Sequence, residues 1–258
     1  MTSGFAADRA CFERSGVLRL TLPTSRALVA FLRAQRSVLA EGIARPRPWH
    51  YTELHNPWGQ CAASYDSWGF LDLCSSEALT DAVAIVLGPD VILYDSQWLP
   101  DPWHGTSDPR HWISDVHRLP VEPQLGVTVL LSIEHWGERG IRFEYLQGSH
   151  IEGEAAGDVL AIAPAAGELL VFDARLRHRV AGIERTGAPI AYIARYFPAT
   201  SRYVRRVELP IHQQLTELYP FINYAKMPLW LVRGVDRAAN DFVTGFNPRA
   251  GRWTSAAW

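Results

Sequence analysis

The sequence has few cysteines and no long hydrophobic run. Its three cysteines, Cys11, Cys61 and Cys74, are scattered, and none belongs to a Cys-x-x-Cys pair. The sequence therefore indicates neither a disulfide framework nor a zinc site, and we expect a cytoplasmic protein. No segment approaches the roughly 20 apolar residues that cross a bilayer, and the charged N-terminus is not typical of a signal peptide. We expect no membrane partner.

An excess of charge is also missing, because 25 lysines and arginines face 27 aspartates and glutamates, for a net charge of −2. This balance gives no electrostatic reason to expect nucleic acid or an anionic surface as a partner. Hydrophobic residues are plentiful at 48%, and ten tryptophans and ten phenylalanines are among them. The aromatic side chains either fill a core or line a pocket for a bulky, apolar small-molecule substrate.

Apolar periodicity predicts helices first and strands afterwards. We expect a strand at 17–22, a helix from Thr24 or Ser25 to about Glu41, and a helix from the Ser75-Ser76 cap to Leu87. Short apolar runs separated by turns then predict strands at 91–94, 126–133, 141–145, 159–162, 168–172, 190–197 and 204–209. A further helix is expected near 213–218. This order predicts a mainly β protein with helices (α+β), a jelly-roll or double-stranded β-helix barrel of the cupin-like kind supported by N-terminal helices.

We expect one domain over residues 1–258. Its parts are a helical support at about 1–90, a barrel core at about 91–210 and an aromatic-rich C-terminal segment at 211–258. The aromatic residues of that last segment predict that it packs over the barrel or against a partner. They are Trp230, Phe242, Phe246, Trp253 and Trp258.

Three short stretches, taken in their order along the chain, resemble a known sequence pattern. They are Trp112-Ile113-Ser114-Asp115, then Gly148-Ser149-His150, then Phe172-Asp173 followed by His178. In this order and spacing, over roughly residues 91–198, the chain resembles the phytanoyl-CoA dioxygenase-like branch of the iron(II)/2-oxoglutarate oxygenases. That family reads Trp-His-x-Asp, a Gly-Ser-His turn and a distal histidine after a Phe-Asp strand end. The resemblance implies a jelly-roll barrel, with Asp115 and His178 at positions of iron ligands.

Two departures from the family pattern concern its metal and its cosubstrate. Ile113 stands where the first histidine ligand is expected, and an alkyl side chain has no lone pair for a metal. Pro189-Ile190 stands where the family places a Pro-Arg pair, whose arginine holds 2-oxoglutarate. Arg185 or Arg195 could take over that role, although neither is at the matching position. We therefore predict a degenerate site without metal or cofactor.

The remaining candidate residues have two interpretations each. Asp115 and His178 either carry protons, or serve as a loop-capping carboxylate and a core histidine. His117 would share the face of Asp115 if the strand continued, and Asp115, His117 and His178 would then form a shifted metal site. Segments that line the pocket in the family also suggest five substrate-binding residues. These are Gln97, Trp98, Trp112, Tyr192 and Arg195.

Three functions of different kinds follow from this pattern. The first is a metal-independent isomerase, cyclase or lyase that acts on a medium-sized apolar molecule of the natural-product type, with Asp115, His178 and His117 as candidate catalytic residues. The second is a hydroxylase that binds iron(II) and 2-oxoglutarate through the shifted site. The third is a non-catalytic subunit that forms a homo- or hetero-oligomer with an active oxygenase homologue.

Overall fold

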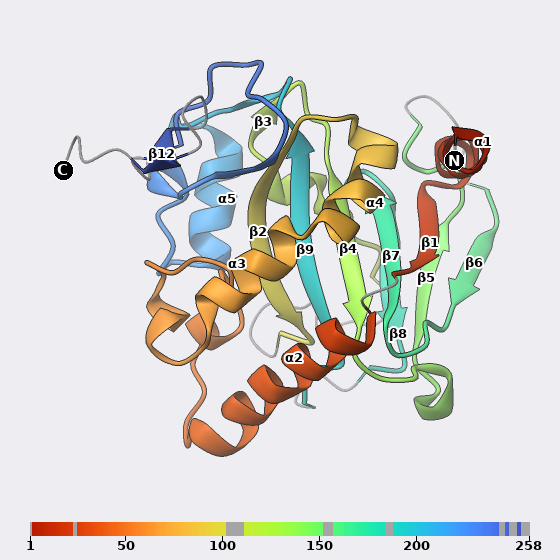
Figure 1. The fold of residues 1–258 in the computed structure, drawn as a ribbon, viewed down its shortest axis with the longest axis horizontal. Coiled ribbons are helices and arrows are strands. Elements are labelled where there is room, and N and C mark those ends of the chain that lie inside the picture. The colour runs from red at the N-terminus through yellow and green to blue at the C-terminus, as the bar shows by residue number, and fades with distance from the viewer. Residues whose placement is uncertain are drawn as a thin grey trace.

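The protein is mainly β-sheet with several helices, in a jelly-roll-like α+β arrangement (Figure 1). The computed structural model describes residues 2–22, 25–101, 111–151, 157–183, 188–242, 246–247 and 252–253. The fold class predicted from the sequence is therefore confirmed. None of the helices in these ranges combines the length and apolar character that a membrane-spanning helix requires.

Six strands form the larger sheet, in the order β1-β7-β4-β9-β2-β11. Their bounds are β1 Val17–Thr21, β7 Glu168–Asp173, β4 Val127–Ser132, β9 Ala191–Pro198, β2 Val91–Leu99 and β11 Trp230–Arg233. A three-stranded sheet has the order β6-β5-β8, with β6 Val159–Ile162, β5 Arg142–Leu146 and β8 His178–Ala181. Two small pairs are β3 Val121–Glu122 with β10 Arg202–Tyr203, and β12 Phe246–Asn247 with β13 Arg252–Trp253. All these pairings are antiparallel.

The α-helices in the described ranges are α1 Thr2–Ser15, α2 Ser25–Ser37, α3 Ser67–Ser75, α4 Glu77–Leu87 and α5 Pro210–Leu218. Shorter helical turns are η1 Val38–Gly42, η2 Pro48–His50, η3 Gln60–Ala63, η4 Asp115–Arg118, η5 Gly137–Arg139 and η6 Tyr224–Lys226. The predicted helices α2, α4 and α5 are confirmed, and α4 ends at Leu87 with Gly88 as its C-cap, as predicted. Helices α1 and α3 were not predicted.

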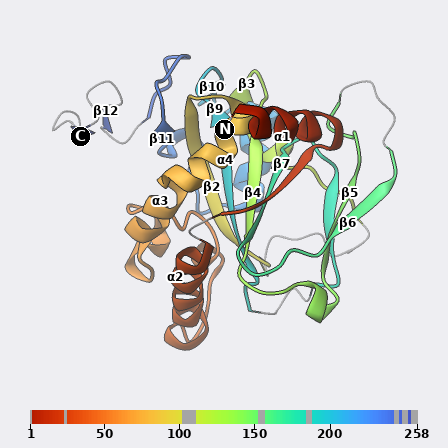
Figure 2. The same ribbon diagram turned by 45° about the vertical axis from the view of Figure 1, so that its right-hand side comes forward.

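The larger sheet separates two apolar layers (Figures 1 and 2). Helices α2, α3 and α4 cover one face, where Leu32, Phe70 and Val83 pack against Val129 and Val171 of the sheet. The three-stranded sheet covers the other face. Alternate residues of one strand point to opposite faces, so each strand of the larger sheet contributes to both layers.

The face of the larger sheet opposite helices α2, α3 and α4, here called the inner face, is covered by different segments over its two halves. Over β7 and β4, the apolar layer contains Phe143 of the smaller sheet together with Leu130 and Phe172. Over β2 and the end of β9, helix α5 and the segment after it provide the cover, with Leu215 and Tyr219 among the buried residues. The boundary between the smaller sheet and α5 lies over the middle of the larger sheet, and polar residues gather there.

Several predicted elements are wrong in their bounds. β2 continues to Leu99 rather than ending at Tyr94, and residues 204–209 form no strand. Strand β8, which begins at His178, was not predicted. In the aromatic C-terminal segment, Trp230 lies on edge strand β11 and Phe242 is buried in the layer beneath α5. Phe246 pairs with Trp253 through β12 and β13, and Trp258 lies outside the described residues.

The turn after β8 brings two glycines together and holds the strand that carries His178. Both Gly140 and Gly182 have φ in the left-handed region, at 67° and 78°. A Cβ on Gly182 would lie 2.5 Å from the carbonyl oxygen of Gly140, whereas a Cβ on Gly140 would meet nothing within 4 Å. Of these two glycines, Gly182 is therefore the one that a close backbone approach requires.

We expect Gly140→Ala to cost about 1–2 kcal/mol of stability, which is the penalty of the left-handed conformation. Gly182→Ala has the same conformational penalty and also a clash with backbone that has no rotamer to change, so its cost is larger by more than about 1 kcal/mol. Urea unfolding of both variants measures the difference. Equal unfolding midpoints would contradict the close approach.

Glu53 is a half-buried carboxyl group on the segment beside β2, where Thr52 and Gln97 form a β-bridge. Its Oε1 accepts one hydrogen bond, from Asn56 Nδ2 at 3.3 Å. Burial, and then the charge of Asp95, raise the pKa of Glu53 to about 7. Because the folded protein binds this proton more tightly than the unfolded chain does, the stabilisation is present at low pH and is lost as the pH rises from about 4.5 to 7.

We therefore predict that the unfolding free energy of the wild type, relative to that of Glu53→Gln, falls by up to about 3 kcal/mol between pH 4.5 and pH 8. Urea titrations across this range measure it. Glu208→Gln, which changes an exposed glutamate, is the matched control for the substitution itself. A Glu53→Gln difference that does not change with pH would rule out the raised pKa.

Candidate functional site

A row of cross-strand neighbours on the inner face of the larger sheet forms the base of the site. Asp95 on β2 is paired with Arg195 on β9, and Arg195 is paired with Thr128 on β4. Paired residues in adjacent strands point to the same face, so these three polar side chains stand side by side on the inner face of the sheet. The register of the sheet is thus what brings Arg195 between a carboxylate and a hydroxyl group.

Asp115 is placed above this row by η4. Its Oδ2 accepts a hydrogen bond from Thr128 Oγ1 at 2.6 Å and a second from Arg195 Nε at 3.2 Å. Asp115 and Arg195 are each 4% exposed. The carboxylate that the sequence singled out is therefore held in a buried ion pair.

The guanidinium group of Arg195 has further partners. Its Nη1 donates to Asp95 Oδ2 at 2.8 Å and to Gln97 Oε1 at 3.0 Å. The same Gln97 oxygen accepts from Arg118 Nη1 at 3.1 Å, and Arg118 Nη1 also donates to the Tyr219 hydroxyl at 2.6 Å. One amide oxygen thus joins two arginines.

Charge and burial act against each other in this cluster. Burial would raise the pKa of Asp115, but the positive charge of Arg195, with smaller effects of His178 and Arg118, outweighs burial and holds that pKa well below its usual range. For Asp95, burial prevails over Arg195 and raises the pKa. Asp115 therefore remains an anion throughout the physiological pH range.

His178 begins β8 and faces the inner layer, where it is 6% exposed. Its ring stacks on Phe143 with centroids 5.4 Å apart and meets the edge of Phe172 at 4.7 Å. The Nδ1 atom lies 3.0 Å from the carbonyl oxygen of Leu176. Burial lowers the pKa of His178, and the charge of Asp115 opposes this effect only in part.

Ile113 is the direct neighbour of His178 across a β-bridge. The two backbones exchange hydrogen bonds of 2.9 Å and 2.8 Å, so their side chains lie on the same face. Ile113 is 36% exposed, so this bridge lies at the surface end of the buried His178 strand pairing. The neighbouring Trp112 is covered by Arg179, whose Cζ lies 4.5 Å from the ring centre. The structure thus places the predicted Trp112 against Arg179 of β8.

His117 does not share the face of Asp115. The chain forms a 3₁₀ turn from Asp115 to Arg118 instead of continuing as a strand, so the assumption behind the shifted metal site is wrong. His117 is exposed, whereas Asp115 and His178 are buried. Within the described ranges, no three His, Cys, Asp or Glu side chains are grouped so that they could hold a metal ion.

Two of the predicted substrate-binding residues face the opposite side of the sheet. Trp98 and Tyr192 pack against Phe70 of α3, and the Tyr192 hydroxyl lies 3.1 Å from Cys74 Sγ. Their assignment to the site is corrected accordingly, because they belong to the core beneath the helices. Ile190 is buried in the apolar layer between the sheets, and Arg185 lies outside the described residues.

The structure brings Asp115, His178, Gln97 and Arg195 into one region, as the sequence suggested, and adds four residues that it did not. These are Asp95, Arg118, Thr128 and Tyr219. A signal existed for Asp95, since it precedes Gln97 by two residues in the run Val91–Leu99. No local pattern pointed to Arg118, because its position depends on the 3₁₀ turn.

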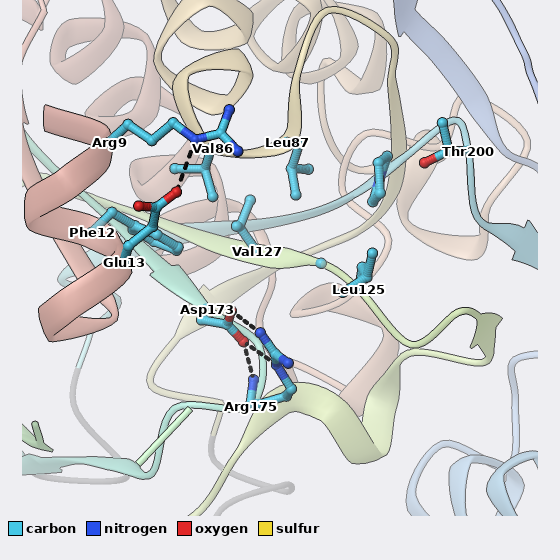
Figure 3. Close-up of a pocket in the computed structure, with 12 residues that line it drawn as sticks. Arg9, Phe12, Glu13, Val86, Leu87, Leu125, Val127, Asp173, Arg175 and Thr200 are labelled. Atoms are coloured by element: carbon cyan, nitrogen blue, oxygen red, sulfur yellow. Dashed lines mark hydrogen bonds and ion pairs between the residues drawn. The ribbon is translucent and has the colours of Figure 1, made fainter. Parts of the chain in front are cut away.

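A separate hollow of about 250 Å³ lies between α1, α4 and the ends of β4 and β7 (Figure 3). Its two arginines each pair with a nearby carboxylate, Arg9 with Glu13 and Arg175 with Asp173. None of the residues predicted from the sequence lines it. Its charged groups are matched to one another, so we assign it no function.

Comparison with known proteins gives the fold. No protein-family model matches the chain, and no curated protein matches its sequence. Among solved structures, CytC3 with Fe(II) and alpha-ketoglutarate is similar with a TM-score of 0.64 and 16% identity, over 96% of this chain and 95% of that one. The nickel complex of the non-heme monooxygenase ThoJ is similar with a TM-score of 0.59 and 18% identity, over 96% and 89% of the two chains.

A third similar structure is the non-heme alpha-ketoglutarate-dependent epimerase SnoN from nogalamycin biosynthesis. Its TM-score is 0.58 at 14% identity, over 79% of this chain and 86% of that one. The similar structures are thus enzymes with varied chemistry on one scaffold, and at these identities the similarity concerns the scaffold alone. The chain has the fold of the non-heme iron, alpha-ketoglutarate-dependent enzymes.

Proposed function

We propose that this chain is an enzyme that uses the oxygenase fold for metal-independent proton transfer. The reaction is an isomerisation, cyclisation or elimination on a medium-sized, largely apolar substrate of the natural-product type. His178 is the proton acceptor, and Asp115 is a fixed anion that positions and stabilises it. The observation that carries the proposal is the buried ion pair between Asp115 and Arg195.

An iron centre of this fold requires two imidazoles and a carboxylate on one face of the metal. The residues present do not fit that requirement. Ile113 is the neighbour of His178 and has no lone pair. The charge of the Asp115 carboxylate is already neutralised by the guanidinium group of Arg195, which is part of the protein. A divalent metal at Asp115 would meet the repulsion of that guanidinium group in a poorly solvated place.

The position of the proton on His178 follows from its backbone contact. A carbonyl oxygen can only accept, so the 3.0 Å contact with the Leu176 carbonyl assigns the proton of the neutral ring to Nδ1. The lone pair is then on Nε2. Burial lowers the pKa of His178 and favours the neutral form near pH 7. The ring is therefore held between Phe143 and Phe172 as a proton acceptor with a defined tautomer.

The role proposed here for Asp115 is that of a fixed negative charge, not the proton carrier that the sequence suggested. Because its pKa is held low, it does not carry protons near neutral pH. Its negative charge instead favours the imidazolium that forms when His178 takes a proton. In the proposed step, Nε2 of His178 removes a proton from a carbon next to a carbonyl group. The same proton returns at another atom in an isomerisation, or remains on His178 while a leaving group departs in an elimination.

The metal-free part of the proposal predicts that anaerobic loading with iron(II), followed by desalting, leaves far less than one iron per chain. 2-Oxoglutarate should not quench the tryptophan fluorescence. Ile113→His adds an imidazole beside His178 and should raise cobalt(II) affinity by at least about tenfold. The gain should vanish in Ile113→His/His178→Ala. About one iron per wild-type chain, with 2-oxoglutarate bound, would refute the proposal.

The catalytic part predicts deuterium exchange. In D2O with chelator and without oxygen, a panel of apolar keto acids and aryl ketones should include compounds that gain one deuterium, detected by mass spectrometry. His178→Gln should slow this exchange by about 10²–10⁴-fold, the usual contribution of a general base. His117→Gln, which changes an exposed histidine, is the matched control and should not slow it. Exchange that survives in His178→Gln would exclude His178 as the base.

A further inference from the structure

We infer that Arg118, supported by Tyr219, binds a carboxylate group of the substrate. This assignment deepens the proposed function, on which it rests for the idea that the same site takes a substrate. It gives the substrate a chemical class: an apolar molecule with a carboxylic acid close to the bond where His178 acts.

The hydrogen bonds that Arg118 forms within the described ranges use only one of its three guanidinium nitrogens, Nη1. Nη1 donates both to Gln97 Oε1 and to the Tyr219 hydroxyl. Within the described part of the chain, Nε and Nη2 donate to no side chain or backbone atom. These two nitrogens form one edge of the planar group, and such an edge is the fork that binds a carboxylate through two parallel hydrogen bonds.

The charge of Arg118 is also unmatched by direct contact. Both carboxylates of the cluster, on Asp95 and Asp115, form their ion pairs with Arg195. Arg118 forms no ion pair with any residue in the described ranges. Gln97 Oε1 accepts from both arginines, which holds two like charges close together. A half-buried cation in that position lacks a direct counter-ion, and a carboxylate would supply one.

The 3₁₀ turn directs Arg118 toward the site. In a 3₁₀ helix, residues i and i+3 eclipse one another. Asp115 and Arg118 are the first and last residues of η4, so their side chains leave the turn on the same side. His117, between them, is exposed. Asp115, whose charge assists His178 in the proposed function, and Arg118 thus lie on the same side of η4.

Tyr219 fixes the orientation of this cation. Its hydroxyl accepts from Arg118 Nη1, and Arg118 Cζ lies 5.4 Å from the centre of the Tyr219 ring. Tyr219 is buried, directly after α5, so it provides a rigid support. Binding of a carboxylate then requires little reordering of the arginine, which favours affinity.

The test uses calorimetric titration of the full chain with 2-naphthoate and with its uncharged isostere, 2-naphthamide. Wild type should bind naphthoate more tightly than naphthamide. Arg118→Gln should weaken naphthoate binding by at least about tenfold, as expected for loss of a charge-assisted bidentate contact, and leave naphthamide binding unchanged. Arg118→Lys, which keeps the charge but not the fork, should have intermediate affinity. Arg26→Gln, at an exposed arginine, is the matched control and should bind like wild type.

Near-ultraviolet circular dichroism establishes that each variant is folded, and Tyr219→Phe provides a second route to the same site. It removes only the hydroxyl that holds Arg118 and should weaken naphthoate binding severalfold. Equal naphthoate affinity in wild type, Arg118→Gln and Tyr219→Phe would overturn the assignment. Wild type that binds naphthoate no better than naphthamide, or neither compound at millimolar concentration, would overturn it as well.

This test is separate from the test of catalysis. His178→Gln should keep naphthoate binding while it loses deuterium exchange. If naphthoate binding depends on Arg118 but no exchange occurs, the anion site stands and the catalytic proposal fails. If exchange depends on His178 but naphthoate binding ignores Arg118, the reverse holds.

Discussion

The interior of this protein depends on one buried cation. Arg195 joins Asp115, which belongs to the segment between β2 and β3, to Asp95, which belongs to the larger sheet. Without it, two carboxylates would remain in a poorly solvated place, and breaking such a pair costs roughly 3–5 kcal/mol. The segment that it anchors also pairs with His178 through Ile113. The position of His178 relative to the larger sheet is thus set by this cation.

The same interaction gives the site its electrostatic character. A carboxylate that serves as a metal ligand has its charge compensated by the metal ion. Here a side chain of the protein itself supplies the compensating charge to Asp115. Such a charge does not exchange with solvent and has no open coordination positions. In the proposed function, the groups that act on the substrate are the Nε2 lone pair of His178 and the Nε and Nη2 edge of Arg118.

Local patterns explain which features were predictable. The helix stripe of α2, the cap and glycine stop of α4 and the isolated run of β6 are encoded within short windows, and each was found. Asp115 and His178 were singled out through the resemblance to a known family, and the structure shows that both are buried. The fold class followed from the order of helices and strands.

Features that depend on the register or on non-local pairing were missed. The assignment of both Gln97 and Trp98 to one pocket was wrong, because adjacent residues on a strand point to opposite faces. Arg118 was missed because the chain after Asp115 turns into a 3₁₀ helix, which no hydrophobic period indicates. The partnership of Arg195 with Asp95 depends on the pairing of β2 with β9, about a hundred residues further along the chain.

Both edges of the larger sheet are formed by segments from the two ends of the chain. Strand β1 closes one edge by pairing with β7, and Arg19 bonds to Glu168 across 149 residues of sequence. Strand β11 closes the other edge beside β2. During synthesis, the β1 edge can close once β7 has been made at residue 173, whereas the β2 edge waits for β11 at residues 230–233. Until then β2 exposes unpaired backbone on that side, and an open strand edge of this kind favours self-association of the nascent chain.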